Sequence, residues 1–366
     1  MKKPIRILHI VSSMDIGGIE TMLMNYYRRL DRRKVQFDFL EHRSRGYYDS
    51  EIESYGGKIC QISAPNPFSP HYRLELMRFF NNHSEYQIVH AHMNCMSSLP
   101  LYYAKKAGVP VRISHAHNTD TPHNVKYPIK IYWKYKIPNV ATDLFACSAE
   151  AGKWMFNGNS FLVLHNAIIT ERFLFDETKR ENVRKRLQLE DSFLVGHVGN
   201  FIKQKNHVFL LKIFREIIRM RRNAKLLLVG EGHLQYQIQC LAKKYGLSDA
   251  VVFYGMSDNV GELLSAMDVF VLPSFYEGLP VALVEAQASG LKCYVSDVIS
   301  DGGDVTNNVE RIGLKEKPSI WASRIIVSGN HYNRFGRGED IIRGRYDISE
   351  NVRWLENYYL KKWKRN

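Results

Sequence analysis

The chain has 366 residues, of which 45% are hydrophobic and 24% are charged. This composition is typical of globular proteins and excludes a disordered, collagenous or coiled-coil chain. The length predicts two domains, and no apolar run reaches the 18 residues that a membrane-spanning helix needs. The five cysteines form no CxxC pair, which disfavours a disulfide framework and a thiolate zinc site and favours a reducing compartment.

The net charge of +14 points to an anionic partner: nucleic acid, a membrane surface or an anionic substrate. The excess is uneven, because the segment from Lys105 to Val140 holds seven basic residues and one acidic residue, Asp120. No nucleic-acid-binding module is recognisable, so we expect no nucleic acid partner.

The chain starts with two lysines and an apolar run, Ile5 to Val11. The run is short, His9 interrupts it, and no small-residue cleavage site follows it. These features argue against a signal peptide. We therefore expect a buried first strand of a cytosolic protein.

Short apolar runs alternate with helix-like segments along the chain. This alternation predicts parallel sheets built from βα units, and runs that are apolar throughout predict strands covered on both faces. In the first half the expected strands are 5–11, 35–40, 58–62, 87–90, 111–114, 143–146 and 161–164. In the second half they are 193–198, 224–229, 251–253, 269–272 and 293–295, with helices over 208–222 and 234–245.

A polar, charged stretch over residues 168–192 separates the two series of strands and is interpreted as a connection followed by a short helix. We therefore predict an α/β protein with two doubly wound domains, residues 1–170 and 171–346, and a closing helix with an aromatic face over 347–366. Ligands of such sheets bind at the carboxyl ends of the strands, so the cleft between the domains is the expected site.

The first motif is the segment from Ser12 to Glu20, which follows the first expected strand and contains Gly17 and Gly18. Paired glycines allow close backbone approach and offer a helix N-terminus to an anion. A tight strand-to-helix turn explains the glycines equally well. No GxGxxG fingerprint or following acidic residue indicates a dinucleotide site.

The second motif is the loop from Gly199 to Asn206, which follows the first strand of the second domain. Lys205 in this loop is a candidate for phosphate binding, and a solvated loop lysine is the alternative. Gly230 and Gly232 in a nearby loop are interpreted as a turn.

The third motif runs from Ser274 to Ala286 and contains two acids eight positions apart. Glu277 lies in a loop, whereas Glu285 lies inside an apolar helix, where a carboxylate is costly unless it has a partner. The helix start at Pro280 and Val281 leaves free backbone amides for an anion. This is the most specific signal in the chain, and a capped helix with one buried acid is the alternative.

The fourth motif is Ser114 to Asn118, which contains His115 and His117. Two histidines at this spacing resemble a metal pair only weakly, and no nearby carboxylate completes a ligand set. The more specific hypothesis is that one of these histidines contacts a sugar hydroxyl. The alternative is that the histidines have a structural role. For His90 and His92 we favour structural roles.

Taken together, these segments resemble the retaining GT-B glycosyltransferases of family 4, also called group 1, and in particular the bacterial exopolysaccharide and capsule biosynthesis enzymes. The resemblance covers nearly the whole chain, and the two-glutamate element is its most specific part. It implies two Rossmann-like domains that face each other across a cleft.

The resemblance also implies roles for individual residues. Glu277, Lys205 and His117 would be catalytic: Glu277 would contact hydroxyls of the donor sugar, Lys205 would bind phosphate, and His117, or His115 two residues away, would be the first-domain histidine. Glu285 would hold the nucleotide ribose. The remaining donor-binding positions would be Gly17, Gly18, Asn200, Gly278, Leu279, Val281 and Ala282.

Asn200 stands where many family members carry an arginine, so the leaving group has one cation fewer here. The implied reaction moves a sugar with retention from a nucleotide sugar, expected to be a UDP-sugar, to a lipid-linked glycan. No DxD motif is present, so we expect neither a metal nor another cofactor. The alternatives are a GT-B nucleotide-sugar epimerase or hydrolase and a non-catalytic nucleotide-sugar-binding subunit.

The basic, aromatic segment from Val125 to Lys136 is the candidate acceptor and membrane surface. Lys126, Lys130 and Lys134 are four residues apart, so a helix would place them on one side. Such a helix fits an anionic leaflet, with rings at the headgroups and lysines in water. An ordinary helix packed on the sheet is the alternative. We expect a cytoplasmic protein that is peripheral at the inner face of the cell membrane.

Overall fold

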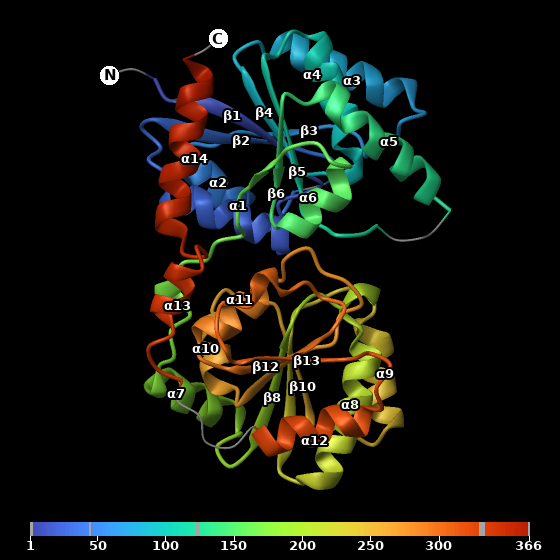
Figure 1. Cartoon of the computed structure of the whole chain (residues 1–366), viewed down its shortest axis with the longest axis vertical. Helices are drawn as coiled ribbons and strands as arrows, with labels where there is room; N and C mark the ends of the chain where they lie inside the picture. Colours follow the sequence, from blue (N-terminus) through green and yellow to red (C-terminus); the bar gives the residue numbers. More distant parts are fainter. Residues whose placement is uncertain (1–2, 44, 122–124, 329–333, 365–366) are drawn as a thin grey trace. The chain divides into compact units, whose positions relative to one another are not determined.

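The computed structural model describes residues 3–43, 45–121, 125–328 and 334–364. The chain divides into two compact units, one formed by Met1–Ala167 with Ile348–Asn366 and the other by Ile168–Asp347. The chain therefore builds most of the first unit, then the whole second unit, and returns to the first with its last helix (Figure 1).

The first unit contains a seven-stranded parallel sheet in the order β3-β2-β1-β4-β5-β6-β7. Its strands are β1 (Ile5–Ile10), β2 (Val35–Glu41), β3 (Ile59–Gln61), β4 (Ile88–Ala91), β5 (Val111–Ala116), β6 (Asp143–Ala146) and β7 (Leu162–Val163). Its helices are α1 (Gly18–Arg29), α2 (Asp49–Ser54), α3 (Pro70–Asn82), η1 (Asn94–Ser97), α4 (Ser98–Lys106), α5 (Tyr127–Val140), α6 (Ala149–Phe156) and α14 (Ile348–Trp363).

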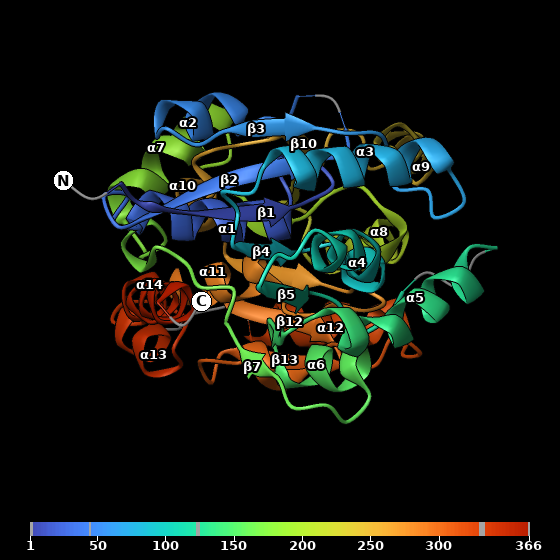
Figure 2. The same cartoon turned by 90° about the horizontal axis from the view of Figure 1, so that it is seen from above.

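Alternate residues of the central strands pack on opposite faces of the sheet. Leu8 and Ile10 of β1 belong to the hydrophobic core beneath α3 and α4. His9 points to the opposite face, because side chains alternate along a strand, and there its ring lies 4.2 Å from that of Phe37. The helix α14 packs on α1 and β2 (Figures 1 and 2), and its fully buried Tyr359 contacts Phe37.

The second unit contains a six-stranded parallel sheet in the order β10-β9-β8-β11-β12-β13. Its strands are β8 (Phe193–Val198), β9 (Ala224–Val229), β10 (Val251–Gly255), β11 (Val269–Leu272), β12 (Lys292–Ser296) and β13 (Val309–Ile312). Its helices are η2 (Thr170–Arg172), α7 (Glu177–Leu187), η3 (Lys203–Lys205), α8 (His207–Met220), α9 (Gln235–Lys244), α10 (Val260–Ala266), α11 (Val281–Ala288), η4 (Asp301–Gly303), α12 (Pro318–Ser328) and α13 (Gly338–Arg343).

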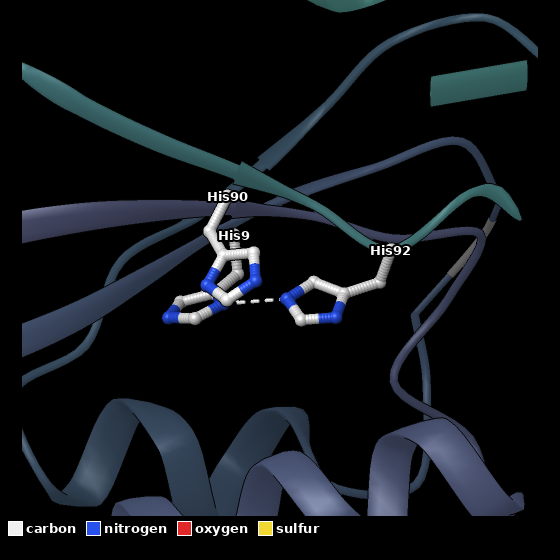
Figure 3. Close-up of side chains that lie close together, drawn as sticks. All are labelled: His9, His90 and His92. Atoms are coloured by element: carbon white, nitrogen blue, oxygen red, sulfur yellow. Dashed lines mark hydrogen bonds between the residues drawn. The ribbon is translucent and has the colours of Figure 1, made fainter. Parts of the chain in front are cut away.

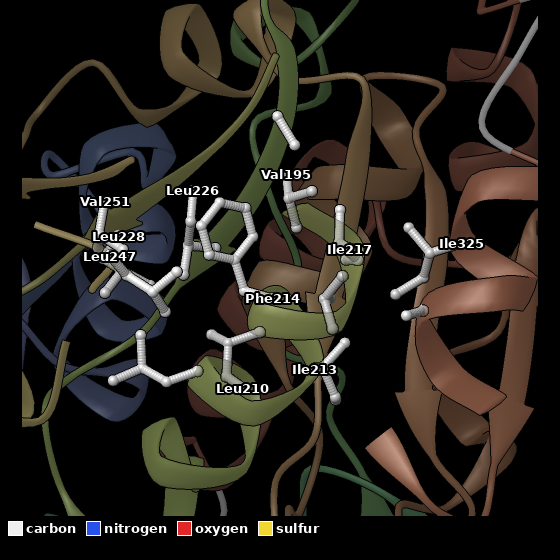
Figure 4. Packing of buried hydrophobic residues seen from close by; sticks show 14 of the residues in the cluster. Val195, Leu210, Ile213, Phe214, Ile217, Leu226, Leu228, Leu247, Val251 and Ile325 are labelled. Atoms are coloured by element: carbon white, nitrogen blue, oxygen red, sulfur yellow. The ribbon is translucent and has the colours of Figure 1, made fainter. Parts of the chain in front are cut away.

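One face of this sheet is covered by α8, α9 and α12 (Figure 1). The apolar residues of α8 recur every three or four positions and therefore form one stripe. Leu210, Phe214 and Ile217 of this stripe pack on Val195 and Leu226 of the strands (Figure 4). The charge-rich α7 packs instead on α10, where Arg180 and Arg184 both contact the carboxylate of Asp268.

The strand β13 was not predicted from the sequence. Its residues, Val309 to Ile312, include a glutamate and an arginine, and it pairs only with β12 among the described strands. An edge strand with one partner tolerates charged side chains, so a search for continuous apolar runs misses it. The predicted closing helix is α14, and it groups with the first unit.

The expectation that Lys134 shares a solvated face with Lys126 and Lys130 is wrong. Lys134 is only 7% exposed, and its ammonium group lies 4.4 Å from the centre of the Trp154 ring of α6. Lys126 is exposed and Lys130 is half-buried. The reason is that α5 packs on α4 and α6, so the side of the helix that carries Lys134 is covered.

In each sheet the strand order reverses once. The reversal lies between β1 and β4 in the first unit and between β8 and β11 in the second. Loops diverge at such a point and leave room for a ligand at the carboxyl ends of the strands. Among the helices that the structure describes, none has the length and apolar character needed to cross a bilayer.

Candidate active site

The reversal point of the second sheet brings together the loops that follow β8 and β11. The Phe275 backbone N–H donates to the Gln204 carbonyl over 2.9 Å, and the Asn206 side-chain amide donates to the Pro273 carbonyl over 3.1 Å. Asn206 has a φ of 56°, a left-handed conformation that asparagine tolerates, and it is the N-cap residue of α8. The two loops are therefore held side by side.

Lys205 and Glu277 meet between these loops. The Lys205 Nζ atom lies 2.7 Å from Glu277 Oε1, and the Gln204 side-chain amide donates to Glu277 Oε2 over 2.9 Å. The lysine and glutamate side chains are 14% and 7% exposed. Charged groups withdrawn from water contribute little net stability, even when they are paired. They do provide a charge that is already oriented when a ligand arrives.

A third loop, after β9, closes tightly against the first. Gly230 has a φ of 136°, and a Cβ atom at this position would lie 2.4 Å from the Gly199 carbonyl oxygen. Only glycine fits both conditions. The predicted turn at Gly230 therefore brings the β9 loop against the backbone just before Asn200, which is uncharged and directly follows Gly199.

The helix α11 follows the loop that carries Glu277. Its first residue is Val281, and Pro280 occupies the N-cap position without a capping side chain. The first amides of a helix have no partner within the helix, so the backbone N–H groups of Val281 and Ala282, and that of Leu279 before Pro280, can offer hydrogen bonds to an anion. Gly278 precedes them in the loop.

Glu285 lies one turn into α11 and is 6% exposed. Burial raises the pKa of its carboxyl group to about 7, and the positive charge of Arg172 opposes this shift. An acid with this pKa is partly protonated near neutral pH. A hydroxyl-bearing ligand in contact with Glu285 would find both a donor and an acceptor in this group.

In the first unit, Gly17 and Gly18 lie where β1 leads into α1, as predicted. The carboxyl group of Glu20 already occupies the space beside Gly17, because a Cβ atom on Gly17 would lie 2.3 Å from Glu20 Oε2. Burial raises the pKa of Glu20 to about 7. An anion at this helix N-terminus would meet Glu20, which the sequence reasoning overlooked.

Five histidines of the first unit form a layer on one face of the sheet. His9, His90 and His115 lie on the adjacent strands β1, β4 and β5, and His92 and His117 follow two positions after His90 and His115. Residues two apart share one face of a strand, which explains the layer. All five are at most 5% exposed, and burial lowers the pKa of each, to about 3 for His9 and His117.

His117 and His115 differ in their surroundings. His117 follows the end of β5, and its backbone N–H donates to the Asn94 side chain over 2.8 Å. His115 is completely buried in the layer, and neither of its ring nitrogens has a hydrogen-bond partner. The geometry therefore favours His117 over His115 as the histidine at the ligand-binding edge of the strand.

Two sets of three histidines bring ring nitrogens within 4.8 Å of one another: His9, His90 and His92, and His92, His115 and His117. These sets are the candidate metal ligands among the described residues. In each set, however, two of the facing nitrogens already share a hydrogen bond. A metal ion would have to displace that shared proton, so the geometry favours hydrogen bonding.

Lys205 and Glu277 are thus in direct contact, Glu285 lies on the next helix, and Gly17, Gly18 and His117 belong to the other unit. The sequence reasoning missed Gln204 and Asn94. No charge or motif distinguishes Gln204, although it is the neighbour of Lys205. Asn94 follows two residues after His92 and has a φ of 48°, which only the structure reveals.

Comparison with known proteins identifies this architecture. Residues 16–172 match the family model "Glycosyltransferase Family 4", and residues 179–318 match "Glycosyl transferases group 1". The putative glycosyltransferase EpsF of Bacillus subtilis (strain 168) is 37% identical over 372 residues, which cover 97% of this chain and 96% of the relative. The chain belongs to the family 4 (group 1) glycosyltransferases.

Two other relatives of this glycosyltransferase are informative. The capsular polysaccharide biosynthesis glycosyltransferase CapH of Staphylococcus aureus is 25% identical over 98% of this chain and 99% of the relative. The UDP-Gal:α-D-GlcNAc-diphosphoundecaprenol α-1,3-galactosyltransferase of Escherichia coli is 27% identical over 62% of each chain.

A solved structure agrees with the fold. Anabaena HepE in complex with UDP and glucose superimposes with a TM-score of 0.80 and 16% identity, over 96% of this chain and 98% of HepE. The two parallel-sheet, Rossmann-like domains of this glycosyltransferase thus form a GT-B fold, as predicted.

The raised pKa of Glu285 predicts a specific pH dependence of stability. The folded protein keeps the Glu285 proton up to about pH 7, whereas the unfolded chain loses it near pH 4.5. The free energy of unfolding should therefore fall by about 3 kcal/mol from this group as the pH rises through this window. Glu285→Gln should remove this contribution to the fall in the free energy of unfolding. Denaturant titrations of both proteins at several pH values measure it. Parallel curves for the wild type and the variant would contradict the assignment.

Proposed function

We propose that this glycosyltransferase transfers a sugar, with retention, from a nucleotide sugar to a lipid-linked glycan in surface polysaccharide biosynthesis. The observation that carries the proposal is the preoriented pair of Lys205 and Glu277 at the strand-order reversal of the second unit. The names of the relatives support the substrate classes: one acts in capsular polysaccharide biosynthesis, and another uses a UDP-sugar and a diphosphoundecaprenol-linked acceptor. We propose a UDP-sugar as the donor.

The chemistry of the transfer requires positive charge near the departing diphosphate. Negative charge develops on the leaving group, and the Lys205 ammonium group with the first amides of α11 would stabilise it there. Glu277 would then accept hydrogen bonds from hydroxyls of the donor sugar, and Glu285 from the ribose. Because Asn200 is neutral, Lys205 bears more of this stabilisation than it would beside an arginine.

In the first unit, His117 would donate or accept a hydrogen bond at the sugar. Since burial lowers its pKa to about 3, the imidazole is neutral at physiological pH. It would therefore act as a hydrogen-bonding group and not as a cation.

Binding and product analysis together test the function. A panel of nucleotide sugars should include one that raises the melting temperature, because a ligand that binds only the folded state stabilises it by mass action. Incubation of that donor with a lipid-linked acceptor should yield a glycosylated lipid. Release of free sugar or an epimer without acceptor would favour the hydrolase or epimerase alternative, and binding without turnover would favour a non-catalytic subunit.

Substitution of the charged pair should reduce transfer without unfolding the protein. Glu277→Gln and Lys205→Ala should each lower kcat by on the order of 10²-fold or more, because each removes a preoriented electrostatic contact. Steady-state kinetics with the identified donor measures the effect, and circular dichroism monitors the fold. Near-normal turnover of both variants would exclude these residues from the mechanism.

A matched control separates the loss of a function from the creation of a buried unpaired charge. The double variant Lys205→Met with Glu277→Gln leaves no unpaired charge, so it should be at least as stable as either single variant. It should nevertheless remain as inactive as they are. Recovery of activity in the double variant would show that the single variants fail through charge imbalance.

The proposed mechanism uses Lys205 and backbone amides in place of a divalent cation, as the missing DxD motif suggests. Transfer should therefore continue at nearly its full rate after incubation with EDTA and removal of the chelator. The measurement is the initial rate before and after this treatment. Loss of activity that manganese or magnesium restores would contradict a metal-independent reaction.

A basic groove in the first unit is our proposed membrane-docking surface. It has a volume of about 870 Å³ and lies between α3, α4 and α5. Its lining includes four cations and four large aromatic residues and, among the described residues, no acid: Arg73, Lys105, Lys106, Lys136, Tyr102, Tyr103, Tyr132 and Trp133. Lys106 and Lys136 each lie over a tyrosine ring. Basic side chains among exposed rings suit an anionic headgroup region.

Charge reversal in this groove should weaken binding to anionic vesicles. Each lysine near an anionic surface contributes about 1 kcal/mol, so Lys105→Glu with Lys106→Glu should lower vesicle partitioning by at least about tenfold. Sedimentation with anionic and with neutral phospholipid vesicles, at low and high salt, measures this effect.

The second unit offers a matched control for this substitution. Lys243 and Lys244 are also adjacent, exposed and in the last turn of a helix, α9. Reversing their charges places the same acids at a helix C-terminus but outside the groove, so vesicle binding should be retained. Equal loss of binding in both double variants would show that net charge, and not the groove, determines it.

A further inference from the structure

Three histidines of the first unit form a continuous hydrogen-bonded chain. His9 Nδ1 lies 2.9 Å from His92 Nε2, and His92 Nδ1 lies 2.9 Å from His117 Nε2. Figure 3 shows the first of these bonds and the position of the two His92 nitrogens on opposite edges of its ring. His92 thus connects β1 to the end of β5.

The number of protons in this chain is fixed by burial. The pKa of each of the three imidazoles is lowered far below neutrality, so each ring carries a single N–H. A neutral imidazole has one donor nitrogen and one acceptor nitrogen. Both hydrogen bonds can therefore form in only two ways: every ring donates towards His117, or every ring donates towards His9.

The two arrangements differ at the ends of the chain. His9 Nε2 and His117 Nδ1 are both buried without a hydrogen-bond partner, so one of them carries an N–H and the other a lone pair. The ring of His9 is enclosed by aromatic rings, those of Phe37, Phe39 and Tyr359. A buried N–H without an acceptor loses its hydrogen bond to water and gains none in return, which costs free energy. This disfavours the arrangement that places an N–H on His9 Nε2.

His117 offers a better place for that N–H. It is 5% exposed, compared with 1% for His9, and it lies just after β5, at the strand ends where ligands of such sheets bind. A hydroxyl or a water molecule can reach this edge more readily than the aromatic interior. The geometry therefore favours the arrangement in which every ring donates towards His117.

We propose that His9 and His92 are positioning residues that keep His117 in the tautomer with its proton on Nδ1. His117 then presents a neutral N–H donor to an oxygen of the bound sugar and is not a general base at that atom. The role of His117 at the sugar rests on the proposed function, whereas the tautomer follows from the hydrogen-bonded chain alone.

The backbone of His117 supports this arrangement. Asn94, in its left-handed conformation, holds the His117 N–H with its side chain over 2.8 Å. The ring of His115 lies 4.1 Å from that of His117 and packs on it without hydrogen bonds. The ring of His117 is therefore held by packing, and the proton on its nitrogen by His92.

Nitrogen NMR of the histidine-labelled protein tests the tautomer directly and requires no substrate. Long-range ¹H–¹⁵N correlations distinguish protonated from unprotonated ring nitrogens, and the spectrum of His117→Gln assigns the His117 signals. The expected result is a protonated Nδ1 on His117, His92 and His9. A proton on Nε2 of His117 in the wild-type protein would overturn the proposal, whether or not transfer activity is found.

Two substitutions at His9 test whether the chain sets the tautomer. His9→Phe keeps a ring against Phe37 but removes the donor to His92, so the His117 signals should shift to a mixture of tautomers. His9→Asn places an amide N–H near the position of Nδ1 and should restore the wild-type signals. An unchanged His117 tautomer in folded His9→Phe would show that His9 does not control it.

Kinetics then separates a positioning role from a merely structural one. His9→Phe should lower kcat/KM by about tenfold, the usual effect of losing one hydrogen bond, and His9→Asn should recover most of it. His90→Gln is the matched control, because it changes the same layer without breaking the chain and keeps an acceptor for the Tyr359 hydroxyl group. It should leave the tautomer and kcat/KM nearly unchanged. A tautomer change in His9→Phe without any kinetic change would refute the role of the N–H in transfer while leaving the proposed function intact.

Discussion

The contact between Lys205 and Glu277 is the interaction on which the second unit's functional edge depends. Two opposite charges lie out of water there, and each needs the other to be tolerable. The loops that carry them are held by backbone and side-chain hydrogen bonds, and Gly230 permits a third loop to approach. The sheet thus holds the two loops rigidly, and the reversal of strand order leaves room for a ligand beside the two charges.

The first unit places uncharged polar groups at the reversal point of its sheet. Its reversal point is lined by imidazoles, which burial keeps neutral, and three of them, His9, His92 and His117, are joined to one another by hydrogen bonds. A neutral ring costs far less free energy to bury than a charged group does. The two units therefore present different chemistry at equivalent places of the same topology: a fixed ion pair in one and neutral donors and acceptors in the other.

Much of this could be predicted from the sequence, and the failures have physical reasons. Continuous apolar runs marked the buried strands because such strands are covered on both faces, but the half-buried edge strand β13 carries Glu310 and Arg311 and gave no such signal. Glu285 was recognisable because an acid within an apolar helix is conspicuous. Gln204 was not, since its role depends on a loop that is distant in sequence. The burial of Lys134 depends on Trp154 of another helix, which periodicity cannot reveal.

The return of α14 to the first unit has a consequence for the order in which the protein is made. Every strand of the first sheet leaves the ribosome before the second unit. Tyr359, which hydrogen-bonds His90 over 2.7 Å and packs on Phe37, leaves it after the second unit. The second unit is one continuous segment and can complete its core as soon as it emerges. During synthesis the histidine layer therefore stays uncovered until α14 has emerged, and the first unit, although begun first, is completed after the second.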